Sequence, residues 1–245
     1  SDVEERNQLK SNKNFKQEIE HFYGMKKDFD KAIKKVRENR NIKIVQVFAT
    51  KGYQLKANDL KRLEETNIYH LDEQGLEYWR NLINRLGGAA RYQLLGDLLE
   101  GVSIPNMMNK VYAVRGKMGG KTYYSFSIEP ERLLKIAYVL HKQKGQDNSP
   151  AYQRIIQKPR LRSIQKYVDE EDGYFPNSII LSYEDSNRSL NFDIQKHQIE
   201  DTKTMPGVLT LPNKYKSVFL VDGQHRLYAY ADSKYAKKNS LPVVL

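Results

Sequence analysis

The stretch Ser217–Ala231 reads SVFLVDGQHRLYAYA and joins two different patterns. Its first part, Ser217–Val221, is a β-branched and apolar run that predicts a buried strand. Asp222-Gly223 follows, and Gln224–Lys238 then has the pattern of a helix. Glycine lets the backbone turn tightly and lets a ligand come close. The stretch therefore predicts a strand that runs through one turn directly into a helix, which is typical of an α/β fold.

Polar groups are also concentrated at this turn. The first N–H groups of a helix lack partners within the helix and lie at the positive end of its dipole, so an anion such as phosphate binds there. His225 and Arg226 add charge-assisted donors to the same turn, beside Gln224. Asp222 can cap the helix or help to hold Mg²⁺ through water. A capped turn with a buried histidine is the alternative interpretation, and we favour the functional one.

The positive charge is concentrated in residues 106–168. The whole chain has 245 residues and a net charge of +11, with 41 Lys and Arg against 30 Asp and Glu. Residues 106–168 alone hold 13 basic and 3 acidic residues, interleaved with tyrosines. Basic residues neutralise phosphates and tyrosine rings can stack on bases, so this segment predicts contact with DNA or a nucleotide. The alternative is a solvated basic face.

Composition excludes several other classes of protein. The chain has no cysteine, which excludes disulfides, thiolate metal sites and a cysteine nucleophile. It has no apolar run of about 20 residues and no signal peptide, so we expect no membrane partner. A reducing cytoplasm suits this composition. The sequence leaves open whether the chain forms a homo-oligomer.

The first hundred residues predict helices around a small parallel unit. An amphipathic helix is expected over residues 13–40, then strands at Ile42–Ala49 and Asn67–Leu71 around a helix that Asn58 caps and that ends at Glu65. This β-α-β order favours parallel strands. Further helices are expected from Asp72, as the cap, to Gly87-Gly88 and over Ala89–Leu99, with Trp79 as a core anchor.

The pattern changes after residue 105. Two alternating runs flank Lys117-Met118-Gly119-Gly120, which predicts a hairpin. Helices are expected over 130–142, 159–170 and 224–238, and strands over 177–182, 190–192, 208–211, 217–221 and 242–245. We therefore place a domain boundary between residues 101 and 110, which gives an N-terminal region of 1–105 and a C-terminal domain of 106–245.

The C-terminal part resembles a known family. The run Asp222–Arg226 (DGQHR) before Leu-Tyr-Ala-Tyr-Ala is similar to the signature of DGQHR-domain proteins, which include DndB-like regulators of DNA phosphorothioation within the ParB/sulfiredoxin-like fold. Tyr152-Gln153-Arg154, Arg160 with Arg162, and FPNSIIL at 175–181 resemble the upstream half of that family. The resemblance covers roughly residues 105–245 and implies a ParB/sulfiredoxin-like C-terminal domain.

The resemblance implies a nucleotide site on the turn. Gly223, Gln224, His225 and Arg226 would bind the phosphates of ATP or another nucleotide, with Arg154 as a second contact. Asp222 would position Mg²⁺ or water, so that Asp222 and His225 would be the catalytic residues if the nucleotide is hydrolysed. For DNA, the expected contacts are Lys158, Arg160 and Arg162.

The sequence differs from the related proteins at two points, and these differences limit which of their activities the resemblance implies. Sulfiredoxins have a catalytic cysteine where this chain has Gln224, so sulfinic-acid reduction is excluded. The arginine-rich box of ParB proteins is absent in its usual form, so CTP switching is not implied.

Residues 1–105 resemble the C-terminal half of a restriction-endonuclease-like domain, but no strand carries the Glu-x-Lys that such a nuclease needs to hold Mg²⁺.

Three functions follow as hypotheses. The favoured one is a nucleotide-binding, DNA-associated protein of a DNA-modification or phage-defence system, and the sequence leaves open whether it also hydrolyses an NTP. The second is a non-catalytic DNA-binding transcriptional regulator, whose turn holds a backbone phosphate without chemistry. The third is part of a nuclease whose catalytic motif lies outside this chain.

Overall fold

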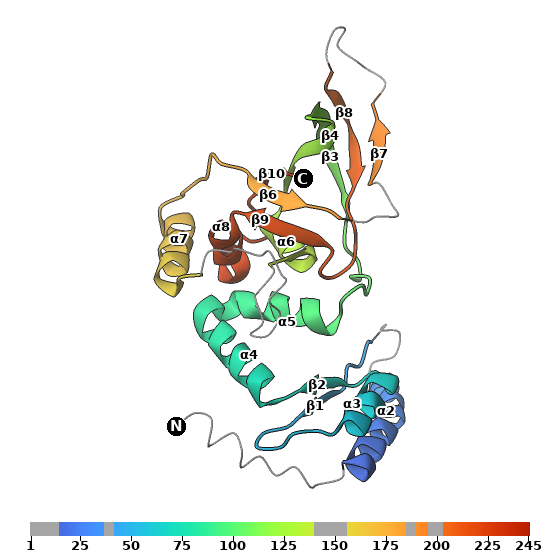
Figure 1. The fold of residues 1–245 in the computed structure, drawn as a ribbon. Coiled ribbons are helices and arrows are strands. Elements are labelled where there is room, and N and C mark those ends of the chain that lie inside the picture. The colour runs from blue at the N-terminus through green and yellow to red at the C-terminus, as the bar shows by residue number, and fades with distance from the viewer. Residues whose placement is uncertain (1–14, 37–41, 140–155, 185–189, 196–202) are drawn as a thin grey trace. The chain divides into compact units, whose positions relative to one another are not determined.

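The chain divides into two compact units. The computed structural model describes residues 15–36, 42–139, 156–184, 190–195 and 203–245 (Figure 1). One unit comprises Ser1–Asn81 and the other Leu82–Leu245. This division lies earlier in the chain than the boundary that we expected between residues 101 and 110, and it falls within helix α4, Glu73–Leu86.

The first unit contains the expected parallel β-α-β arrangement. Its elements are α2 (Lys16–Val36), β1 (Val47–Ala49), α3 (Ala57–Glu65), β2 (Tyr69–Leu71) and the start of α4. Strands β1 and β2 pair in parallel, with Phe48 opposite His70. β1 is shorter than the expected strand Ile42–Ala49, because β2 is only three residues long and offers no partner for the earlier residues.

Of the two N-cap residues that the sequence predicts for the first unit, the structure confirms one and not the other. Asp72 caps α4 as expected, since its Oδ1 accepts a hydrogen bond from the Gly75 N–H at 2.7 Å. Asn58 does not cap α3, because that helix begins one residue earlier and Lys56 takes the N-cap position without a side-chain hydrogen bond. Trp79 is 6% exposed, which confirms it as a core residue.

The second unit is built around a mixed sheet. Its elements are η1 (Gly87–Ala89), α5 (Ala90–Leu98), β3 (Lys110–Met118), β4 (Lys121–Ile128), α6 (Pro130–Ile136), β5 (Ala137–Tyr138), α7 (Lys158–Glu170), β6 (Ile179–Ser182), β7 (Asn191–Ile194), β8 (Met205–Thr210), β9 (Val218–Asp222), α8 (Gln224–Ala229), η2 (Tyr230–Asp232) and β10 (Leu241–Val244). The eight strands have the order β5-β9-β6-β10-β4-β3-β8-β7. β10 is parallel to β6 and antiparallel to β4, so the expected α/β class is confirmed.

In the described part of the chain, helices α6 and α8 lie on one side of this sheet. Alternate residues of β3 point to opposite faces, so Val111 and Ala113 are buried while Tyr112 is exposed. Leu133 of α6 and Leu227 of α8 are fully buried on the covered side. α8 packs against β6, and α6 packs against α8 (Figure 1). Among the described residues, no helix is long and apolar enough to cross a lipid bilayer.

Two helices end earlier than their sequence patterns indicate. α6 stops at Ile136 instead of Lys142, because Ala137 and Tyr138 pair as a strand with β9. α8 stops at Ala229 and continues as a 3₁₀ turn to Asp232. The Ser233 hydroxyl then donates to Asp169 and accepts the N–H of Tyr235, which replaces helical hydrogen bonding.

The segment before residue 105 forms hydrogen bonds with residues much later in the chain. The Gly101 N–H donates to the Tyr215 carbonyl at 3.3 Å, and the Ile104 N–H donates to the Asn213 carbonyl at 2.7 Å. Arg91 donates to Asp232 at 2.8 Å. These bonds explain why the compact unit begins well before the hairpin.

We expect a piece of residues 73–245 to remain folded and a piece of 106–245 to unfold more readily. The shorter piece lacks α5 and the residues that bond to Asn213, Tyr215 and Lys216, which leaves backbone groups and apolar surface exposed. Thermal unfolding of the two pieces, followed by circular dichroism, measures this difference. Equal melting temperatures would instead support a boundary near residue 105.

Candidate functional site

The turn after β9 has the geometry that the sequence predicts. β9 ends at Asp222, Gly223 is the N-cap with φ of +95°, and α8 begins at Gln224. A Cβ atom at position 223 would lie 2.5 Å from Cδ1 of Ile179 on the neighbouring strand β6. Only glycine suits both this backbone conformation and this close approach.

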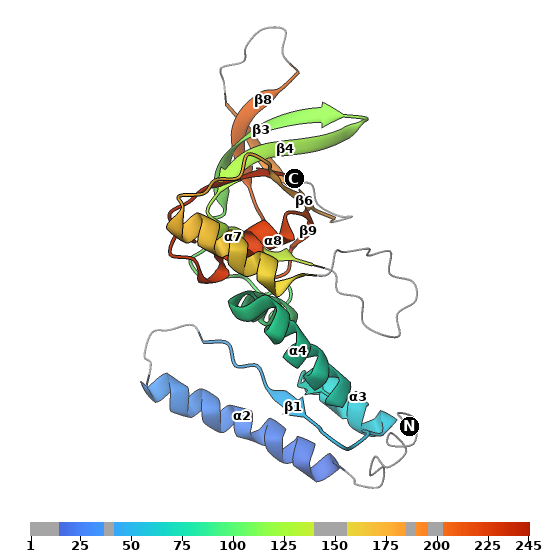
Figure 2. The same ribbon diagram turned by 90° about the vertical axis from the view of Figure 1, so that its left-hand side faces the viewer.

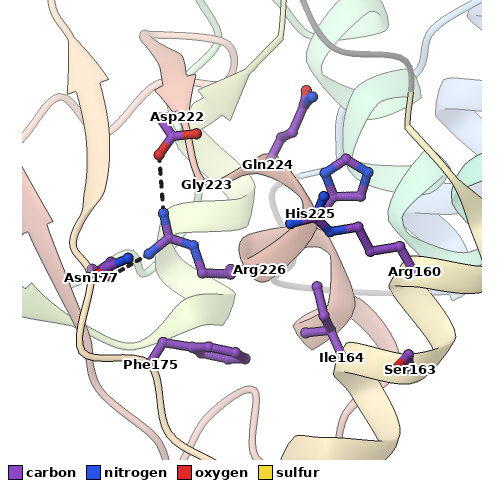
Figure 3. Close-up of a pocket in the computed structure, with 10 residues that line it drawn as sticks. All are labelled: Arg160, Ser163, Ile164, Phe175, Asn177, Asp222, Gly223, Gln224, His225 and Arg226. Carbon is purple, nitrogen blue, oxygen red and sulfur yellow. Dashed lines mark hydrogen bonds and ion pairs between the residues drawn. The ribbon is translucent and has the colours of Figure 1, made fainter.

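A pocket of about 510 Å³ opens at this turn (Figure 3). It is lined by Asp222–Arg226 and by Arg160 of α7, so six of the residues predicted for the site meet there. Ligand pockets commonly measure about 300–1,000 Å³, so this one can hold a nucleotide-sized molecule. Arg154 lies outside the described residues.

Four further lining residues were not singled out for the site by the sequence analysis. They are Ser163 and Ile164 of α7 and Phe175 and Asn177 of the segment that leads to β6. A signal for the first two exists, because residues three and four positions after Arg160 lie on the same face of a helix. Phe175 and Asn177 reach the pocket through tertiary packing, and no local pattern indicates that.

Arg226 is held by the protein itself. Its guanidinium donates to the backbone carbonyl of Asn177, to that of Ser178 at 3.2 Å and to Oδ2 of Asp222 at 3.2 Å. The side chain is only 16% exposed. Arg226 therefore ties the start of α8 to the segment before β6, and so fixes two walls of the pocket relative to each other.

Asp222 faces solvent at the pocket. Its side chain is 66% exposed, and its ion pair with Arg226 offsets its charge. Within the described ranges, no group of three or more His, Asp or Glu side chains could hold a metal ion. A Mg²⁺ ion beside Asp222 would need most of its oxygen ligands from phosphates and water.

His225 links the two helices that border the pocket. It is 8% exposed, and its Nε2 accepts a hydrogen bond from the backbone N–H of Gln157 at 3.2 Å. An accepting Nε2 places the proton of the neutral ring on Nδ1. His225 thereby orients the beginning of α7, where Arg160 lies one turn further on.

The beginning of α7 carries unbalanced positive charge. Lys158, Arg160 and Arg162 lie in its first turns, which contain no acidic residue. Cations at a helix N-terminus oppose the helix dipole, so their clustering there concentrates positive potential. No described residue forms an ion pair with these three side chains. Arg160 points this charge at the pocket, whereas Lys158 and Arg162 are exposed outside it.

Comparison with known proteins identifies one family. The family model DndB, described as DNA-sulfur modification-associated, matches residues 111–245, which is more than half of the chain. Searches among curated proteins and solved structures found no match. The ParB/sulfiredoxin-like fold of the second unit and the restriction-endonuclease-like character of residues 1–105 therefore stay predictions.

Proposed function

The chain belongs to the DndB family of DNA-sulfur modification-associated proteins, and on that premise we propose that it is a nucleotide-binding, DNA-associated regulator of a DNA phosphorothioation system. One observation carries the nucleotide part of this proposal. The turn Asp222–Arg226 and the cationic start of α7 border a single pocket of nucleotide size. The family match supports the association with DNA modification.

The pocket offers a different environment to each part of a nucleotide. Arg160 and the first N–H groups of α8 supply donors for phosphates. Ile164 and Phe175 supply an apolar wall against which a base can pack. Arg226 contributes by holding the walls in place, since at least three of its contacts are to the protein itself.

Hydrolysis of the bound nucleotide is a more specific proposal, and it depends on Asp222. A group that activates water must reach both the water and the phosphate. Asp222 is exposed at the pocket, whereas His225 is buried and its Nε2 already accepts a hydrogen bond from Gln157. If phosphate release accompanies binding, we assign water activation to Asp222 and a positioning role to His225.

Replacing Arg160 with alanine should weaken ATP binding to the full chain about tenfold or more, because a charge-assisted contact contributes about 1.5–3 kcal/mol. Arg162→Ala is the matched control: it removes the same charge from the same helix but not from the pocket. Isothermal titration calorimetry with ATP and Mg²⁺ measures both. Equal affinities for the two variants, or no binding by the wild-type chain, would contradict the proposal.

The second candidate is a DNA-binding regulator without chemistry at the pocket. It is favoured by Lys158 and Arg162, which are exposed on α7 and have no ion-pair partner in the described part of the chain. On this view α7 lies along the DNA backbone, and Arg160 holds a backbone phosphate.

For this candidate we expect a changed dependence of DNA affinity on salt. Each phosphate contact contributes a log–log slope of about −0.9, so Lys158→Gln with Arg162→Gln should make the slope shallower by about one to two units. Fluorescence anisotropy with labelled duplex DNA over a range of salt concentrations measures it. A slope equal to that of the wild-type chain would remove α7 from the DNA interface.

A further inference from the structure

The β3–β4 hairpin extends beyond the sheet as a two-stranded ribbon. β8 pairs with β3 only as far as Arg115, and on the other side the backbone of Leu245, just after β10, bonds with that of Tyr124 in β4. Beyond these points the two strands pair with each other, from Gly116 opposite Tyr123 to Met118 opposite Lys121. Figure 2 shows the end of β3 and the start of β4 projecting past the neighbouring strands.

The β3–β4 hairpin that ends in this ribbon carries positive charge and no negative charge. Residues 110–128 contain Lys110, Arg115, Lys117 and Lys121 and no acidic residue. Arg115 is engaged within the unit, since its Nη2 lies 2.9 Å from Sδ of Met205 and its guanidinium lies 5.1 Å from the Phe192 ring centroid. The three lysines are exposed and form no ion pair with any described residue. Their charge is therefore available to a partner.

Exposed apolar side chains accompany these lysines. Met118, at the tip, is 76% exposed, and Tyr112, nearer the sheet, is 82% exposed. Alternation along the strands and the register of β3 with β4 place both on the same face as Lys110 and Lys121. This face combines positive charge with apolar surface, which suits a polyanion that also presents apolar groups.

The ribbon is also thin at the point where it leaves the sheet. A Cβ atom at Gly116 would lie 2.4 Å from Cζ of Tyr123, so the Tyr123 ring covers the position that a side chain at 116 would occupy. The ring therefore lies across the ribbon instead of standing away from it. The absence of a side chain at 116 keeps this part of the ribbon narrow.

We propose that the β3–β4 ribbon is a DNA-binding arm whose tip, residues 117–121, enters a groove of duplex DNA. The major groove is about 12 Å wide and 8.5 Å deep and admits a two-stranded ribbon. Three residues of a strand span about 10 Å, so the free part of the ribbon matches the depth of the groove. Lys117 and Lys121 contact phosphates on the groove edges, and Met118 contacts base edges or sugars.

This arm is distinct from the pocket. The inference rests on the proposed association with DNA but not on the proposed nucleotide site, because none of the ribbon residues lines the pocket. A site on the ribbon predicts that DNA affinity and nucleotide affinity respond to different substitutions. The two proposals can therefore fail separately.

The test compares two pairs of substitutions in the full chain, with a short labelled DNA duplex as the probe. Lys117→Gln with Lys121→Gln removes two charges from the ribbon. Lys234→Gln with Lys238→Gln removes two charges from exposed positions after η2 and is the matched control. We expect the ribbon pair to lose about tenfold or more in affinity and to have a log–log salt slope shallower by about two units. The control pair should change neither quantity appreciably.

Met118→Ser separates the apolar contact from charge. It should weaken DNA binding without changing the salt slope, because it removes no charge. All of these side chains are exposed, so the melting temperature and the ATP affinity of each variant should equal those of the wild-type chain. Wild-type DNA binding that the ribbon pair leaves unchanged would overturn the ribbon proposal alone. A wild-type chain that does not bind duplex DNA would overturn the association with DNA as well.

Discussion

Arg226→Ala is expected to destabilise the region around α8 by about 2–3 kcal/mol, since hydrogen bonds to a charged group contribute about 1.5–3 kcal/mol each and do not add fully. The guanidinium holds the carbonyls of Asn177 and Ser178, which precede β6, to the first turn of α8. Alanine leaves both carbonyls without this donor. Hydrogen exchange of the β6 and α8 amides should then accelerate about 30- to 150-fold, because each 1.4 kcal/mol corresponds to a factor of ten.

Two further variants identify the cause of that loss. Asp222→Asn removes the ion pair with Arg226 but keeps both bonds to the carbonyls, and Asp222 is 66% exposed, so we expect a cost below about 1 kcal/mol. Arg226→Lys keeps the charge but loses the planar fork that reaches two carbonyls, so it should rescue little. Full rescue by lysine would show that charge alone, and not the hydrogen bonds to Asn177 and Ser178, stabilises the turn.

Gly223→Ala should be about as costly, for a different reason. The residue has φ of +95°, a conformation that costs an L-amino acid about 1–2 kcal/mol. An added Cβ would also lie 2.5 Å from Cδ1 of Ile179. We expect the variant to lose about 2–4 kcal/mol in total and to bind ATP more weakly, because the turn must move away from β6.

Gly101→Ala is the matched control for this substitution. Gly101 has φ of +73°, and a Cβ built there meets no atom within 4 Å. It therefore carries the conformational cost without the collision. Thermal unfolding and ATP titration of both variants separate the two contributions. Equal losses of stability, with ATP affinity unchanged in both, would show that the approach of Gly223 to Ile179 does not shape the pocket.

Local patterns predicted the elements that local chemistry determines. The turn at Asp222-Gly223 follows from an apolar run, one glycine and a polar helix start, and all three features lie within a few residues of one another. The cap at Asp72 and the hairpin around Gly119-Gly120 are local in the same sense. In each of these cases neighbouring residues in the chain supply the hydrogen bonds or the backbone freedom that the element needs.

The remaining features depend on partners far away in the chain. The partners of Arg226 are the carbonyls of Asn177 and Ser178, which no motif around Arg226 indicates. α6 ends at Ile136 because β9, which comes much later in the sequence, pairs with the residues that follow. The hydrogen bonds of Tyr215 with Gly101 and Val102 likewise join segments that the sequence assigned to different domains.

The central claim is that the pocket at Asp222–Arg226 binds a nucleotide. Amide chemical-shift changes on titration of the full chain with ATP and Mg²⁺ test it most directly, because they locate the ligand as well as detect it. We expect the largest changes at the amides of Gly223–Arg226 and of Arg160–Ile164, and none that saturate within residues 15–81. Saturable changes confined to other segments, or no changes at millimolar ATP, would contradict the claim.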